Sequence, residues 1–150
     1  MKTAIKVAFC SFLLLCSACA SSGGPKYADV PVQVEPGKAS VVVYRWSSLK
    51  GAAWTHRVFL DGQHVADLRS GEFTRFFVEP GVHEISTGTM SHPKVLVANV
   101  EALAGNSSFV EDHPGYNLYT PDRLMVVDQA RAEKNLRSGY VYHAPIGSGQ

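Results

Sequence analysis

From residue 39 onward the chain consists of short runs of β-branched and aromatic residues, and each run ends in a turn signal. Asp61-Gly62 is a typical hairpin turn, and Pro80-Gly81 supplies the two residue types that a tight turn favours. Strands separated by turns in this way are typical of all-β sandwiches. No alternation of strands with long helices occurs, which argues against a parallel α/β sheet.

The pattern predicts strands at residues 40–46, 55–60, 64–69, 72–78, 82–87, 94–103, 107–111 and 123–127. The first run is apolar on both faces, which predicts a central strand that is covered on both sides. Asp128 is expected to cap a short helix that ends near Arg137. The predicted fold is therefore mainly β, an antiparallel β-sandwich of the immunoglobulin-like or transthyretin-like type with one short C-terminal helix.

The N-terminal segment has the layout of a bacterial lipoprotein signal. Two lysines precede a short apolar stretch, and the small residues Ser17 and Ala18 stand directly before Cys19. The apolar stretch is shorter than the ~20 residues of a membrane-spanning helix. We therefore expect residues 1–18 to be a cleaved signal peptide and Cys19 to carry the lipid, including fatty acyl chains such as palmitate. An ordinary signal peptide would instead leave a free thiol.

The cysteine positions agree with this interpretation. All three cysteines, Cys10, Cys16 and Cys19, lie at or before the predicted cleavage site. Lipidation of the last one would leave no thiol for disulfides, catalysis or metal binding. Ala20 and Ser21 follow the cysteine, where aspartate would retain an enterobacterial lipoprotein in the inner membrane. This difference favours the periplasmic face of the outer membrane.

Acidic and basic residues are nearly balanced in the chain that would remain after cleavage. Loss of Lys2 and Lys6 would lower the basic residues from 14 to 12, against 13 acidic residues. Such a balance predicts no nucleic-acid partner.

We expect residues 19–38 to form the lipidated cysteine and a flexible tether, residues 39–143 to form the sandwich, and residues 144–150 to be a loose tail. Residues 139–143 are expected to be an edge strand or an ordered end.

Several pieces of the chain, in their order after the lipoprotein signal, resemble a family of bacterial lipoproteins that is catalogued as a domain of unknown function. The pieces are Pro36-Gly37-Lys38-Ala39, Val43-Tyr44-Arg45, Val58-Phe59-Leu60-Asp61-Gly62, Leu68-Arg69-Ser70-Gly71-Glu72-Phe73, Val78-Glu79-Pro80-Gly81-Val82-His83 and Val127-Asp128-Gln129-Ala130. The resemblance covers about residues 36–137. It implies a compact β-sandwich on the cell envelope and brings no catalytic residues with it.

Aromatic side chains in predicted loops are the candidate binding residues. Trp54 stands between the first two strands, and Tyr116 and Tyr119 stand in a late polar loop. Exposed aromatics in such loops can stack on sugars or contact a partner protein. An alternative for Trp54 is a role in anchoring its loop on the core.

Metal binding and catalysis are weaker hypotheses. The six histidines are scattered over different strands and loops and are interpreted as surface or turn residues: His56, His64, His83, His92, His113 and His143. Glu111 and Asp112 are expected to point to opposite faces of a solvated strand end. No Gly-x-Ser-x-Gly elbow lies on a strand-to-helix turn. Convergence of these two carboxylates with His92 and His113 would favour a metal site or an enzyme.

We therefore expect a lipid-anchored, periplasmic, non-catalytic module without a cofactor. Its partner would be another envelope protein, cell-wall glycan or a small ligand. The main alternative is an accessory subunit of an envelope complex that pairs through a sheet edge. A metal-dependent or hydrolytic enzyme is the third hypothesis.

Overall fold

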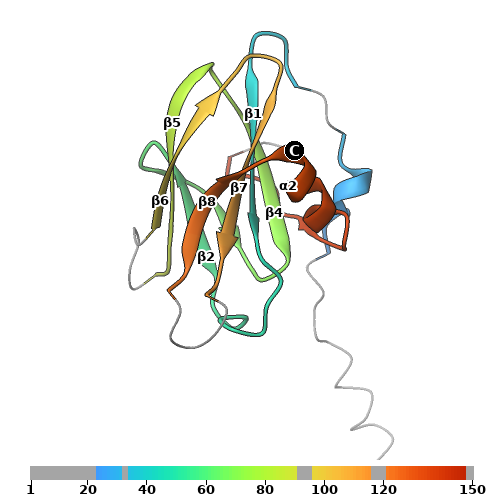
Figure 1. Cartoon of the computed structure of the whole chain (residues 1–150), viewed down its shortest axis with the longest axis vertical. Helices are drawn as coiled ribbons and strands as arrows, with labels where there is room; N and C mark the ends of the chain where they lie inside the picture. The colour runs from blue at the N-terminus through green and yellow to red at the C-terminus, as the bar shows by residue number, and fades with distance from the viewer. Residues whose placement is uncertain (1–22, 32–33, 91–95, 116–120, 148–150) are drawn as a thin grey trace, which may run out of the picture.

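The computed structural model describes residues 23–31, 34–90, 96–115 and 121–147, and its strands form two sheets packed as a β-sandwich (Figure 1). One sheet has the order β8 (Arg123–Val127), β7 (Ser107–His113), β1 (Ala39–Arg45), β4 (Glu72–Val78) and β9 (Val141–Tyr142). The other has the order β3 (Gln63–Leu68), β2 (His56–Leu60), β5 (Gly81–Gly88) and β6 (Leu96–Ala102). The predicted mainly β sandwich is confirmed.

Strand β1 lies at the centre of the five-stranded sheet, and all seven of its residues are buried. Val41 and Val43 pack between the two sheets, whereas Val42 and Tyr44 pack on the outer face. A strand that is covered on both faces is apolar along its length rather than alternating between apolar and polar residues. The prediction of a central, doubly covered strand is confirmed.

Two strand pairs are parallel, which the turn pattern did not predict. β1 pairs with β7 and β4 pairs with β9 in parallel, while the other pairs are antiparallel. The chain passes through β5 and β6 of the opposite sheet before it returns to β7. It therefore re-enters beside β1 in the same direction, a relation that no local hairpin signal encodes.

The Asp61-Gly62 hairpin forms as predicted between β2 and β3. Both residues have positive φ, 48° and 84°, as the tightest hairpin turns require. Asp61 Oδ1 accepts a hydrogen bond from the Glu84 amide at 2.8 Å, and Oδ2 lies 2.7 Å from His83 Nδ1. The hydrogen bond with His83 lowers the pKa of Asp61, and the same contact raises the pKa of His83.

A short helix covers the outer face of the five-stranded sheet. Helix α2 (Gln129–Leu136) begins at Asp128, whose Oδ1 accepts a hydrogen bond from the Arg131 amide at 2.8 Å (Figure 1). The predicted N-cap is confirmed. Ala132 and Leu136 of the helix are fully buried against the sheet, in the same cluster as Tyr44.

A buried carboxylate fastens this helix to the sheet. Glu111 on β7 is fully buried and accepts hydrogen bonds from Tyr44 Oη at 2.5 Å, Arg131 Nη2 at 2.7 Å and Asn135 Nδ2 at 3.2 Å. Burial and the hydrogen bond to Glu111 raise the pKa of Tyr44. Charge-assisted hydrogen bonds of this kind offset the loss of hydration of the carboxylate.

The N-terminal segment is packed on the domain, which corrects the expected boundary at residue 39. Short helix η2 (Tyr27–Asp29) buries Tyr27, whose backbone N–H donates to the Tyr140 carbonyl at 3.1 Å. Tyr142 N–H donates to the Pro25 carbonyl at 2.8 Å, and Lys26 forms a β-bridge with Val141. Burial of the Tyr27 ring in the apolar cluster on the sheet stabilises the docking of this segment.

The described part of the C-terminal tail also lies against the sandwich. Ile146 N–H donates to the Val65 carbonyl on β3 at 2.7 Å. The expectation of a loose tail from residue 144 is therefore wrong at Ile146. Among the described residues, no helix has the length and apolar composition that crossing a bilayer requires.

Removal of the Glu111 carboxylate tests how the helix is held. We expect Glu111→Ala to lower the free energy of unfolding by about 2–3 kcal/mol, because the buried Tyr44 hydroxyl and the Asn135 amide lose their acceptor. Urea denaturation measures this change. The control, Asp67→Ala, removes a partly exposed partner of His64 and should cost less than about 1 kcal/mol. Equal effects of the two variants would contradict a structural role for Glu111.

Candidate functional site

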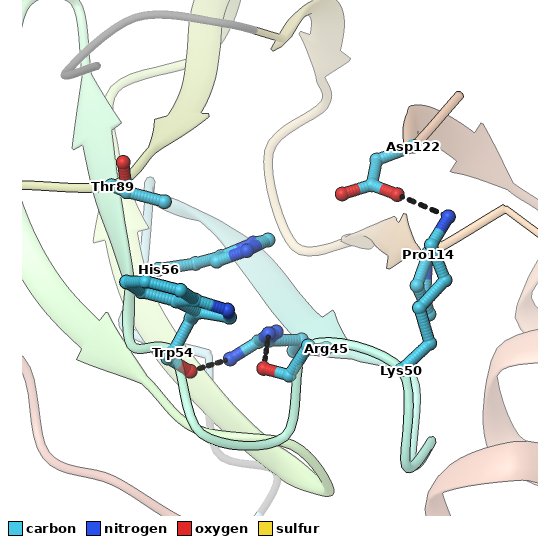
Figure 2. A pocket seen from close by; sticks show the side chains of 8 residues that line it. Arg45, Lys50, Trp54, His56, Thr89, Pro114 and Asp122 are labelled. Atoms are coloured by element: carbon cyan, nitrogen blue, oxygen red, sulfur yellow. Dashed lines mark hydrogen bonds and ion pairs between the residues drawn. The ribbon is translucent and has the colours of Figure 1, made fainter. Parts of the chain in front are cut away.

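A cavity of about 470 Å³ opens at the end of the sandwich where β1 and β7 finish and β2 begins. We call it the loop-end cleft, and its described lining residues are Arg45, Lys50, Gly51, Trp54, His56, Thr89, Pro114 and Asp122. Figure 2 shows Trp54 and His56 on one side of the cavity and Lys50 and Asp122 on the other. Its volume lies in the range of small-molecule sites.

A buried histidine–aspartate pair joins the two sheets beside the cleft. His56 Nδ1, on β2, lies 2.6 Å from Asp112 Oδ2, on β7. Asp112 is only 1% exposed, and an ionised carboxylate can only accept hydrogen bonds. The imidazole therefore donates through Nδ1 and directs its other nitrogen, Nε2, away from Asp112. Nε2 has no hydrogen-bond partner within the described residues, and the ring lines the cleft.

A buried arginine shapes the loop that carries Trp54. Arg45, the last residue of β1, donates from Nη1 to the Trp54 and Leu68 carbonyls and from Nη2 to the Gly51 carbonyl at 2.8 Å. The bonds to the Gly51 and Trp54 carbonyls fold the loop after β1 back over the guanidinium and are the dashed lines at Arg45 in Figure 2, whereas the bond to Leu68 joins Arg45 to β3. Burial lowers the pKa of Arg45, and the charge of nearby Asp112 partly offsets that effect.

An ion pair forms the opposite wall of the cleft. Lys50 Nζ lies 3.2 Å from Asp122 Oδ1, and the same oxygen accepts a hydrogen bond from the Gly115 amide at 3.1 Å. Partial burial acts to raise the pKa of Asp122, but the bonds from Gly115 and Lys50 outweigh it and the pKa is lowered. The carboxylate is thus ionised at neutral pH, so the cleft presents both signs of charge.

Trp54 provides an aromatic surface at the rim of the cleft. Its side chain is 65% exposed, although its backbone carbonyl is held by Arg45. The alternative role for Trp54, anchoring its loop on the core, is therefore wrong for the indole. The other two candidate aromatics, Tyr116 and Tyr119, lie outside the described residues, as does Cys19.

The structure corrects the interpretation of the Glu111–Asp112 segment. The two side chains point to opposite faces, as predicted, but neither is solvated: Glu111 is 0% and Asp112 is 1% exposed. Parallel pairing of Tyr44 with Glu111 and of Arg45 with Asp112 places both acids in the interior. Their hydrogen-bond partners lie on distant elements, which is why the local sequence looked like a surface strand end.

The described histidines do not converge on one point, and the interpretation of all six as surface or turn residues is wrong for His56 and His113, which are buried on β2 and β7. His64 pairs with Asp67, His83 with Asp61 and His143 with Glu72, while His113 packs on the Trp46 ring; His92 lies outside the described residues. No group of three histidine, cysteine, aspartate or glutamate side chains that could hold a metal occurs in the part of the chain that the structure covers. The expected meeting point of His92, His113 and the two carboxylates is therefore not seen there.

Sequence reasoning missed His56, Arg45 and Asp112 as members of one site. The available signal was Arg45 itself, a charged residue at the end of an otherwise apolar strand, because a buried guanidinium needs several acceptors. The pairing of His56 with Asp112 spans 56 residues of sequence and depends on how the two sheets stack.

Comparisons with family models, curated proteins and solved structures found no match to this chain.

Loss of the Arg45 guanidinium tests the architecture of the cleft. In Arg45→Met, the carbonyls of Gly51, Trp54 and Leu68 lose their donor, so the loop should loosen. We expect the Ala52 and Trp54 amides, which bond within this loop, to exchange hydrogen about tenfold faster. Hydrogen-exchange mass spectrometry measures the change. Arg123→Met removes an exposed arginine near the same end and should leave these rates unchanged; unchanged rates in both variants would contradict the proposed brace.

Proposed function

We propose that the protein is a lipid-anchored, non-catalytic binding module of the bacterial envelope, and that the loop-end cleft is its binding site. The observation that carries the proposal is the exposed indole of Trp54 at the rim of a cavity lined by charged and hydrogen-bonding side chains. Ligand sites commonly combine an apolar surface with a few fixed polar groups. The lipoprotein signal ending in Cys19 supports the anchor and the periplasmic location.

The cleft chemistry favours a sugar-sized ligand, such as a unit of cell-wall glycan. The flat indole of Trp54 can stack on the apolar face of a sugar ring. His56 Nε2 and the Lys50–Asp122 pair offer both donors and acceptors to ligand hydroxyl groups. Arg45 uses its hydrogen bonds on the loop, so its role is to hold the site rather than to contact ligand.

Sheet-edge pairing has less support at β9 and β3, two of the four edge strands that the structure describes. The outer side of β9 is bridged by Lys26, and the β3 edge accepts a hydrogen bond from Ile146. Native proteins cover edge strands in this way to prevent pairing with other chains.

A catalytic use of His56 also has less support. Thr89 supplies the one hydroxyl among the described lining residues, and these include no serine or cysteine. Ser47 and Lys50 have a Ser-x-x-Lys spacing, but Lys50 is paired with Asp122. The imidazole is therefore assigned to ligand binding.

Replacement of the lipidated cysteine tests the anchor. We expect Cys19→Ala to abolish lipid labelling and to release the domain from the membrane fraction, because two or three acyl chains supply the stable attachment. Metabolic labelling with a fatty acid and membrane fractionation measure both effects. Cys16→Ala is the control and should remain labelled. Membrane fractionation of Cys19→Ala that equals that of the wild type would contradict lipid anchoring.

Truncation of the indole tests the binding site. We expect Trp54→Ala to weaken binding of soluble peptidoglycan fragments at least about tenfold, as loss of an aromatic hot spot does. Calorimetry on the detergent-solubilised protein measures the affinity. Val82→Ala, an exposed apolar residue on β5, should bind like the wild type. No binding by the wild-type protein, or equal binding by Trp54→Ala, would contradict the proposed ligand site.

A further inference from the structure

We propose that the end of the sandwich that bears the cleft rests on the lipid bilayer, with Leu49, Trp54 and Met90 in the headgroup layer. The inference rests on the anchor at Cys19 in the proposed function, and it adds an orientation and a membrane-docking surface.

The point where the described chain begins lies beside the loop that carries Trp54. Gly23 and Gly24 line one cavity together with Thr55, the residue after Trp54, with Arg69 from the β3–β4 connection and with Glu72, the first residue of β4. Gly24 is pressed against β9: a Cβ atom built on it would lie 2.0 Å from the Tyr142 carbonyl oxygen. The chain therefore leaves the domain close to its cleft-bearing end.

The connection from that point to the lipid is short. Four residue steps separate Gly23 from Cys19, and even a fully extended chain covers at most about 14 Å in four steps. Docking of Pro25 and Tyr27 on the domain prevents the rest of the predicted tether from lengthening this connection. The anchor thus holds the domain against the membrane surface.

The same short connection keeps the opposite end of the sandwich away from the membrane. Strand β1 has seven residues and spans about 23 Å, which exceeds the reach of the connection. Val82 is 73% exposed, at the end of β5 that pairs with the last residues of β6. The exposed apolar surface of Val82 therefore lies beyond the reach of the anchor. Position 82 can be compared with Trp54 as a site that should not touch the bilayer.

The cleft-bearing end carries side chains suited to a lipid interface. Leu49 is 96% exposed, Trp54 65% and Met90 79%, and they project from the loops that follow β1 and β5. Tryptophan is enriched where bilayer and water meet, because its ring is apolar and its N–H is polar. Lys50 is paired with Asp122 at this end, so the three apolar side chains, rather than Lys50, carry the contact.

Contact of these three residues with the bilayer would open the loop-end cleft at the membrane surface. A lipid anchor makes such a weak apolar contact effective, because it keeps the surface concentration high. The Trp54 indole would then be shared between lipid and ligand, so that lipid contact and glycan binding at the cleft would compete.

Fluorescence quenching by brominated lipids tests this orientation. Trp46→Phe leaves Trp54 as the one tryptophan of the chain. In this experiment the full-length lipidated variant is to be reconstituted in phosphatidylethanolamine–phosphatidylglycerol vesicles whose acyl chains carry bromine near the headgroup. The expected result is a loss of about half of the Trp54 fluorescence relative to unbrominated vesicles. Adding Leu49→Asp and Met90→Asp should reduce the quenching, because both side chains are exposed and their charge disfavours insertion.

A reporter at the other end provides the matched control. The variant that combines Trp46→Phe, Trp54→Phe and Val82→Trp should show no quenching. Quenching of Trp54 that is absent, or equal to that of the Val82→Trp reporter, would overturn the orientation. Mass spectrometry of the same sample reads the lipid on Cys19, and its absence would overturn the anchor together with the orientation. Glycan binding measured in detergent is independent of both results.

Discussion

The parallel pairing of β1 with β7 brings two adjacent carboxylates, Glu111 and Asp112, into the interior of the protein. A buried carboxylate is costly unless charged or polar partners replace its hydration. Glu111 finds these partners on the outer face, in Tyr44 and helix α2. Asp112 finds His56 on the opposite sheet. One strand therefore fixes both the position of the helix and the wall of the cleft.

The shape of the loop-end cleft follows from these buried charges more than from apolar packing. Arg45 lies beside Asp112, holds the loop after β1 through the Gly51 and Trp54 carbonyls, and also donates to the Leu68 carbonyl on β3. Trp54 is consequently held at the rim by its backbone, and its indole remains exposed. The cleft therefore presents an exposed aromatic surface at its rim that is held by backbone hydrogen bonds rather than by packing of the indole in the core.

Local signals in the sequence predicted most of the elements. The bounds of β4 and β8 and the cap at Asp128 agree with the prediction, because hydrophobic patterning and side-chain capping act over a few residues. The parallel pairs, the docking of Tyr27 and the burial of Glu111 and Asp112 depend on partners far away in sequence. Trp54 could be selected from its position in a loop, whereas the pairing of His56 with Asp112 could not.

The docked N-terminal segment connects the fold to the proposed location. Because Tyr27 and Pro25 are held on the sheet, the point where the described chain begins, at Gly23, lies at the same end of the domain as the cleft. Binding and anchoring would then be geometrically linked, with the bilayer as a boundary of the binding site.

The cleft wall depends on Asp112, which holds the His56 ring with Nε2 directed to the cleft. Nitrogen-15 NMR of the imidazole at mildly alkaline pH measures which ring nitrogen carries the proton. We expect the tautomer with the proton on Nδ1, because that nitrogen donates to the buried carboxylate. A His56 ring with the proton on Nε2, or one that exchanges freely between tautomers, would contradict it.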